Sequence, residues 1–316
     1  FFSLASAIGI IEEMGFEAEY FVSPYWSCNS TYAWNCELAV RLGLLLERVR
    51  PDVVVFDGTW PFQGLMAACK AYGEPALAWS NRGLFKEGAQ AVPVEESAFD
   101  LIIQPGEIGA SYSEHDLAGK CKRITVPPVT VLDEHELVGQ VAAREALGLE
   151  PDGRYVLFSL GPGNLKDVSG IGQGLIRRFE SAGFKAVWAR PPISVQDVEF
   201  PSGVKLLSVY PLARYLRAFD VFVGAAGYNS CCELVQAQVP SILVPNEQLV
   251  DDQARRARLV AEYAPAVVSA CASEEQREDA VARVLAKVPC QRTPVPAIAL
   301  NGAHLAADAI LALANR

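Results

Sequence analysis

The chain has 316 residues, 51% of them hydrophobic and 20% charged, so it is long enough for two domains and apolar enough to bury a core in each. This composition argues against intrinsic disorder. The formal net charge of −10 disfavours a general binder of nucleic acid or anionic membranes, and no apolar run approaches the ~18 residues typical of a transmembrane helix.

The first part of the chain alternates helical and strand patterns. Helices are predicted at 2–14, 36–49 and 62–72, and strands at 18–22, 52–56, 76–79, 101–103 and 123–126. The continuous apolar run before Asp57 favours a parallel strand covered on both faces. An α/β domain usually begins with a strand and a loop, so we expect these to precede residue 1 and to be absent from this sequence. The irregular stretch 23–35 is a second candidate gap.

A break in the pattern separates the two parts. Pro127-Pro128 ends the first part, Asp133 is predicted to cap a helix over 133–147, and Pro151-Asp152-Gly153 signals a turn. We therefore predict an N-terminal domain over 1–130 and a C-terminal domain over 131–316. The last helix is expected to pack back on the N-terminal domain.

The second part repeats the alternation more clearly. Strands are predicted at 155–159, 185–189, 204–207, 221–223, 241–244 and 266–268, and helices at 167–182, 212–218, 228–238, 250–262, 274–286 and 297–315. Strands that alternate with helices predict a parallel, doubly wound sheet with right-handed crossovers. Ligands of such sheets bind at the carboxyl ends of the strands.

The eight cysteines include no Cys-x-x-Cys pair, and several lie within apolar or helical patterns. We expect reduced thiols in a cytoplasm rather than a disulfide framework. With three histidines in the chain, a His-based metal site is not expected, and neither is a cofactor.

The segment 220–233 carries the clearest functional pattern, a buried strand, a turn of small residues and a helix start. The turn lets a ligand approach the backbone, and the helix start offers free N–H groups to a diphosphate. Asn229 and Ser230 add side-chain donors, and Glu233 is suited to bind the two hydroxyls of a ribose. The alternative is structural, with the small residues serving packing and Asn229 or Ser230 capping the helix.

A second polar group follows the strand between Pro240 and Pro245. Asp251-Asp252-Gln253 stands at the start of the next predicted helix. A carboxylate beside an amide suits the hydroxyls of a hexose, whereas the alternative is again a helix cap.

Together these motifs resemble the donor-site signature of GT-B glycosyltransferases. The pattern Gly227-Tyr-Asn-Ser-x-x-Glu233, then Pro240 and Pro245, then Asp252-Gln253 is similar to UDP-glycosyltransferases of the glucuronosyl and plant type. It also resembles the peptidoglycan N-acetylglucosaminyl transferase group, with a family 28 type of C-terminal domain. The resemblance implies an α/β GT-B fold, with two Rossmann-like doubly wound parallel-sheet domains facing a cleft.

The resemblance also assigns roles to single residues. It implies a glycine loop after the strand 155–159, a base contact at Tyr210, and a base or phosphate contact at Arg190. The implied donor-binding residues are Gly161, Gly163, Asn164, Arg190, Tyr210, Ala226, Gly227, Tyr228, Asn229, Ser230, Glu233, Asp252 and Gln253. The implied acceptor-side residues are Asp57, Gly58 and Thr59. The alternative for Tyr210 is a core or hinge aromatic.

Two departures from the family pattern concern the chemistry. Many members carry a His at the position of Ala225, so a side-chain contact to the diphosphate is lost here. The usual catalytic base, a His or Asp, lies in the loop after the first N-terminal strand. That loop is expected to be absent from this sequence, so no base is assigned.

The resemblance implies an inverting, metal-independent transfer of a sugar from a UDP- or dTDP-sugar. The acceptor hydroxyl would belong to a small molecule, a glycan or a lipid-linked compound, with no nucleic-acid partner. A bacterial cytoplasmic enzyme, monomeric or homodimeric, is expected. The alternatives are a sugar-nucleotide hydrolase or 2-epimerase, a non-catalytic sugar-nucleotide-binding subunit, and a two-domain binding protein of the periplasmic type.

Overall fold

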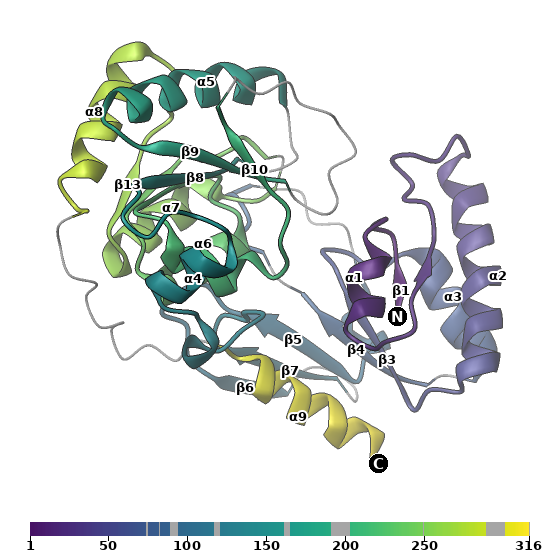
Figure 1. The fold of residues 1–316 in the computed structure, drawn as a ribbon. Coiled ribbons are helices and arrows are strands. Elements are labelled where there is room, and N and C mark those ends of the chain that lie inside the picture. Colours follow the sequence, from purple (N-terminus) through teal and green to yellow (C-terminus); the bar gives the residue numbers. More distant parts are fainter. Residues whose placement is uncertain are drawn as a thin grey trace.

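The computed structural model forms two Rossmann-like α/β units (Figure 1). It describes residues 1–73, 75–81, 83–88, 94–116, 121–160, 165–190, 203–248, 250–288 and 301–315. The predicted α/β fold with two Rossmann-like parallel-sheet units is confirmed.

The N-terminal unit is built on a five-stranded sheet in the order β3-β4-β5-β7-β6. Its strands are β3 (Val53–Asp57), β4 (Ala76–Ser80), β5 (Leu101–Pro105), β6 (Ser113–Asp116) and β7 (Lys122–Val126). All pairs are parallel except β6 with β7, which is antiparallel. Strand β6 was not predicted, because its polar sequence has no apolar alternation.

Helices cover both faces of this sheet. Helices α2 (Thr31–Val49) and α3 (Gln63–Tyr72) pack on one face, where they meet Leu77 and Trp79 of β4. Helix α9 (Ala303–Ala314), near the end of the chain, packs on the other face against Ala78. In Figure 1 it lies beside β6 and β7, so the chain returns to the N-terminal unit.

The start of the chain differs from the prediction. Residues Phe2–Ser3 form β1, which pairs in parallel with β2 (Glu19–Tyr20), and helix α1 spans only Ile8–Glu13. The predicted helix over 2–14 is therefore wrong at its beginning. Tertiary contacts outweigh the helical periodicity there, because the Phe2 ring stacks on Phe21 at 5.8 Å. A two-residue strand and residues 4–7 thus precede α1.

The C-terminal unit has a six-stranded parallel sheet in the order β10-β9-β8-β11-β12-β13. Its strands are β8 (Tyr155–Ser159), β9 (Lys185–Ala189), β10 (Lys205–Leu207), β11 (Val221–Gly224), β12 (Ser241–Leu243) and β13 (Ala266–Val268). The chain fills the sheet outward from β8 on one side and then outward from β11 on the other. The strand order therefore reverses between β8 and β11, which is where Rossmann sheets bind ligands.

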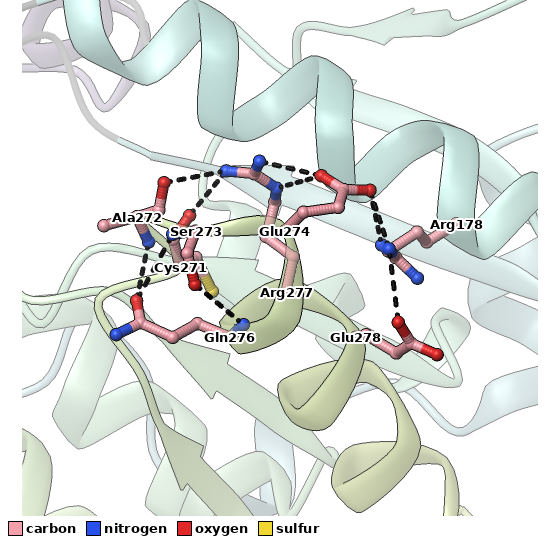
Figure 2. A network of polar contacts seen from close by, with 8 residues as sticks. All are labelled: Arg178, Cys271, Ala272, Ser273, Glu274, Gln276, Arg277 and Glu278. Carbon is pink, nitrogen blue, oxygen red and sulfur yellow. Dashed lines mark hydrogen bonds and ion pairs between the residues drawn. The ribbon is translucent and has the colours of Figure 1, made fainter.

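The helices of this unit also lie on both faces of the sheet, as α4 (Gln140–Ala146), α5 (Leu165–Ser181), α6 (Tyr228–Ala237), α7 (Gln253–Tyr263) and α8 (Glu274–Leu285). Figure 2 shows how α8 is fixed to α5 on the face away from α6 and α7. Arg178 of α5 pairs with Glu274, and Glu274 also pairs with Arg277. Arg277 lies against Gly174, where a Cβ atom would come within 2.8 Å of its Nε.

Two predicted helices of the C-terminal part differ in the structure. The segment 133–147 divides into a short 3-10 helix η2 (Glu134–Glu136) and α4, because the Val138 N–H donates to the Arg214 carbonyl instead of continuing a helix. The segment Leu212–Ala218 is a 3-10 helix, η3, rather than an α-helix. Neither change alters the strand order of the sheet, which positions the site.

Candidate functional site

The turn between β11 and α6 lies where the strand order reverses, and its two glycines have different surroundings. A Cβ atom on Gly224 would come within 2.4 Å of the Phe222 ring and 2.7 Å of the Ser159 carbonyl oxygen, so close packing requires this glycine. A Cβ atom on Gly227 would meet no atom of the described residues within 4 Å. The turn is therefore closed at the strand and open at the helix.

Gly227 is the N-cap of α6, and within the described part of the chain no side-chain cap of this helix is formed. The first N–H groups of a helix have no partner within it, so they require a side chain, water or a ligand. Asn229 is exposed and Ser230 half-buried in this first turn. The arrangement offers N–H groups and the positive end of a helix dipole toward open space, which is a suitable environment for an anion.

Glu233 lies one turn further along α6, on the same side as Asn229 and Ser230. Its carboxylate forms no hydrogen bond or ion pair with the part of the chain that the structure describes. Burial raises the pKa of this carboxyl to about 7. A half-buried carboxylate without a donor is a group that a ligand with hydroxyls can satisfy.

Ala226 and Tyr228, on either side of Gly227, have different surroundings. Ala226 is fully buried in a hydrophobic core cluster. The Tyr228 hydroxyl donates to the Gly106 carbonyl at 3.0 Å and accepts the Val129 N–H at 3.1 Å. Of these two predicted donor residues, Tyr228 thus lies in the contact between the units and Ala226 in the core.

Arg256 of α7 is a residue that the sequence analysis missed. Its side chain is only 1% exposed and bonds to Glu107 of the N-terminal unit, to Asp251 and to the Ala226 carbonyl. Burial alone would lower the pKa of its guanidinium, but the bonds to Asp251 and Glu107 outweigh burial and raise it. An Arg on the apolar face of a predicted helix, four residues before Val260, was the available signal.

Asp252 and Gln253 serve the local structure in the described chain. The Asp252 carboxylate caps α7 by accepting the Arg255 N–H at 2.9 Å, and Gln253 is buried and accepts the Asn246 N–H. The helix begins at Gln253 rather than at the predicted residue 250. Val250 and Asp252 bond instead to the backbone of Lys86 and Leu84 in the N-terminal unit.

Other predicted donor residues are distributed along the same sheet edge. Arg190 is exposed directly after β9, and Tyr210 is exposed after β10. Gly161, Gly163 and Asn164 lie outside the described residues. The structure thus brings the residues of α6 together and leaves Arg190 and Tyr210 at the ends of β9 and β10, which lie beyond β8 from β11.

The predicted acceptor-side residues follow β3 at the carboxyl edge of the N-terminal sheet. The Ser80 hydroxyl donates to the Asp57 carboxylate at 3.0 Å, and the Trp79 indole N–H donates to the Gly58 carbonyl at 2.8 Å. Thr59 is half-buried. Beside them, the buried Oδ1 of Asn81 has no hydrogen-bond partner among the described residues.

Within the described ranges, no three or more His, Cys, Asp or Glu side chains gather as a metal site, and no helix is long and apolar enough to cross a membrane. The cysteines in those ranges are free thiols. Burial raises the pKa of Cys231, next to the site, to about 12, so this thiol stays protonated at neutral pH.

The chain is similar to known proteins in part of its sequence and in its fold. Residues 193–308 match the sequence model of the glycosyltransferase family 28 C-terminal domain. No curated protein sequence matches the chain. Among solved structures, the spinosyn forosaminyltransferase SpnP is similar at a TM-score of 0.58 and 16% identity, over 89% of this chain and 81% of that one.

Two further structures share the fold. The spinosyn rhamnosyltransferase SpnG, complexed with thymidine diphosphate, has a TM-score of 0.52 and 16% identity over 96% of this chain and 84% of that one. The S. aureus MnaA–UDP co-structure has a TM-score of 0.61 and 10% identity over 97% and 84%. Residues 193–308 thus match a glycosyltransferase family 28 C-terminal domain, and the whole chain shares its two-unit Rossmann-like fold with these structures.

Proposed function

We propose that the chain transfers a sugar from a nucleoside-diphosphate sugar to an acceptor hydroxyl, with inversion at the anomeric carbon and without a metal. The observation that carries this proposal is the uncapped, open start of α6 beside the unpartnered Glu233 carboxylate. One group suits an anion and the other suits paired hydroxyls, which is the order of diphosphate and ribose in a donor.

The α6 N-terminus would hold the diphosphate. Backbone N–H groups of residues 228–230 and the helix dipole stabilise negative charge, and this charge grows as the nucleoside diphosphate departs. Ala225 supplies no polar side chain, so the backbone and Ser230 carry this role. Two solved structures of the same fold hold thymidine diphosphate and UDP, which are ligands of this class.

Glu233 would bind the ribose, and Asp252 would contact the sugar. An ionised carboxylate accepts two hydrogen bonds, which matches the two hydroxyls of a ribose. The Oδ1 of Asp252 is already occupied by the cap of α7, so a sugar contact falls to its Oδ2. Arg190 and Tyr210, at the ends of the neighbouring strands, would face the base.

Asp57 would take the proton of the acceptor hydroxyl. It ends β3 on the acceptor side, and the residues 4–7 that link β1 to α1 contain neither His nor a carboxylate. In the proposed step the acceptor oxygen bonds to the anomeric carbon and its proton passes to Asp57. The bond to the diphosphate breaks, and its electron pair leaves with the phosphate oxygen.

A panel of nucleoside diphosphates and their sugars tests the binding half. A ligand at about 100 times its dissociation constant should stabilise the fold by roughly 2.7 kcal/mol, measured by thermal shift. No shift with any UDP or dTDP compound would contradict the proposal.

Products test the chemical half. Incubation of a bound sugar nucleotide with a panel of hydroxylated acceptors should give a glycoside of inverted configuration. Asp57→Asn should abolish turnover while donor affinity stays unchanged. Release of free sugar without acceptor would indicate a hydrolase instead, and a changed sugar on the nucleotide would indicate an epimerase.

A further inference from the structure

The peptide that carries the Gly227 N–H is fixed on one side by Arg256 of the C-terminal unit and on the other by a contact with the N-terminal unit. Before it, the Ala226 carbonyl accepts a hydrogen bond from Arg256 Nη1 at 3.2 Å. After it, the Tyr228 hydroxyl bonds to Gly106 and Val129. Among the described residues, no atom lies within 4 Å of a Cβ atom placed on Gly227, between these two anchors. The turn is thus held by Arg256 on one side and, through Tyr228, by the N-terminal unit on the other.

Arg256 determines the direction of this peptide. In a trans peptide the C=O and the following N–H point in opposite directions. A carbonyl of Ala226 that points at Arg256 therefore directs the Gly227 N–H away from Arg256. The guanidinium also lies over the Tyr228 ring, 5.7 Å from its centroid, so one side chain contacts the residues on both sides of Gly227.

The guanidinium is itself held by two carboxylates. Glu107, in the loop after β5, accepts from Nε and Nη2 at 3.0 and 2.7 Å. Asp251, just before α7, accepts from Nη1 and Nη2 at 2.9 and 2.7 Å. Loss of the Glu107 charge would leave one side of the Arg256 guanidinium without its carboxylate partner. The hydrogen bond from Arg256 to the Ala226 carbonyl would then lose its fixed geometry.

We propose that Arg256 is a positioning residue of the donor site, through which Glu107 of the N-terminal unit sets the direction of the Gly227 N–H toward the diphosphate. This inference rests on the proposed function. It makes the anion site of the C-terminal unit depend on a carboxylate from the other unit. The N-terminal unit then contributes to donor binding in addition to carrying the acceptor side.

A second buried ion pair provides a matched control. Arg144 is 7% exposed and pairs with Asp220, whose side chain is 18% exposed, whereas Arg256 is 1% and Glu107 17% exposed. Arg144 also bonds to backbone carbonyls, those of Ala218 and Pro151. All its partners lie within the C-terminal unit, so it has the same burial and chemistry without contact to the β11–α6 turn.

The experiment measures the affinity of the full chain for UDP and UMP, and for dTDP and dTMP, together with the melting temperature. Glu107→Gln and Arg256→Lys are compared with Asp220→Asn and Arg144→Lys. Lysine has a single ammonium group and cannot bridge two carboxylates and a carbonyl as arginine does. All four variants should lower the melting temperature, since each weakens a buried pair.

Only the two variants of the Arg256 cluster should weaken diphosphate binding, by about tenfold, with monophosphate affinity changed less than about twofold. If Arg256→Lys does not fold, Glu107→Gln decides alone. Equal changes in diphosphate affinity for Glu107→Gln and Asp220→Asn, or none in either, would overturn the inference while the proposed function stands. A wild-type chain that binds no nucleoside diphosphate would remove both.

Discussion

The carboxyl edges of the two sheets differ in how far their polar groups are satisfied. At the N-terminal sheet, the Asp57 carboxylate accepts a hydrogen bond from the Ser80 hydroxyl, and the Gly58 carbonyl accepts one from the Trp79 indole N–H. At the C-terminal sheet, α6 has no side-chain cap and Glu233 has no partner among the described residues. Most polar groups at the first edge thus have hydrogen-bond partners. At the second edge, the uncapped start of α6 and the Glu233 carboxylate do not have such side-chain partners within the described part of the chain.

This difference identifies the edge that is prepared for a ligand. Folding usually pairs buried polar groups, so an unpaired set is costly unless another function compensates for it. Substitutions that satisfy or remove the free groups should then stabilise the protein and weaken binding. Substitutions on packed positions should only destabilise it.

Glu233→Gln should give the largest change. Burial raises the pKa of Glu233 from its ordinary value of 4.5 to about 7, so the stability that goes with its protonated form is complete below about pH 4.5 and is lost as the pH rises through 7. The variant should therefore exceed the wild type in unfolding free energy by up to about 3 kcal/mol at alkaline pH, and match it in acid. Urea unfolding from about pH 5 to about pH 9 measures this.

The same variant should flatten the pH dependence of binding. Ribose hydroxyls donate best to the ionised carboxylate, so wild-type nucleotide affinity should rise through about pH 7 by more than phosphate ionisation explains. Asp57→Asn, at the carboxyl edge of the N-terminal sheet, is the control. It should not stabilise the chain, because the Asp57 carboxylate already accepts a hydrogen bond from Ser80. An equal gain in stability from both variants would contradict the comparison.

Gly224→Ala tests the packed end of the β11–α6 turn. Its methyl group would overlap the Phe222 ring and the Ser159 carbonyl, so the unfolding free energy should fall by about 1–3 kcal/mol. Gly43→Ala, in α2 with no atom near its Cβ, should instead be neutral or slightly stabilising. A Gly224→Ala variant as stable as the wild type would show that the turn is not closed there.

Gly227→Ser tests the open end of the same turn. Serine is a better N-cap than glycine, so the variant should gain a few tenths to about 1 kcal/mol of stability. Its hydroxyl would accept a first-turn N–H that the diphosphate needs, and UDP affinity should fall by about tenfold. The measurements are thermal unfolding and titration calorimetry.

Gly139→Ser is the matched control for this substitution. Gly139 is the uncapped N-cap of α4, with φ −64° and ψ 158° against −68° and 153° at Gly227, and its Cβ position is also open. It should gain the same stability without any change in affinity. A loss of affinity in Gly139→Ser as well would attribute the effect to global changes rather than to the site.

The sequence alone predicted most of the C-terminal sheet, for physical reasons that particular strands show. The strands β8, β9 and β13 form over the predicted residues, because parallel strands buried on both faces are short apolar runs between turn signals. The pairing of β1 was missed because it depends on Phe21, distant in sequence from Phe2. Strand β6 was missed because its edge position demands no apolar pattern.

The site could be predicted only where a local pattern carried it. The glycine turn, Ser230 and Glu233 lie within one strand–turn–helix segment, so their arrangement follows from that segment. The pairing of Arg256 with Glu107 joins residues far apart in the chain and depends on how the two units meet. No local pattern in the sequence specifies such a contact.

Asp252→Ala should give the smallest effect, and it separates the two interpretations of this carboxylate. Loss of the α7 cap should cost about 1 kcal/mol of unfolding free energy. Ser273→Ala removes the equivalent cap of α8, on the opposite face of the sheet, and should cost about the same. If Asp252 also contacts the sugar, its variant alone should weaken binding of a UDP-sugar relative to UDP. An equal ratio of UDP-sugar to UDP affinity in both variants would leave Asp252 as a helix cap only. The ligand-binding groups at the carboxyl edge of the C-terminal sheet would then extend no further than Glu233.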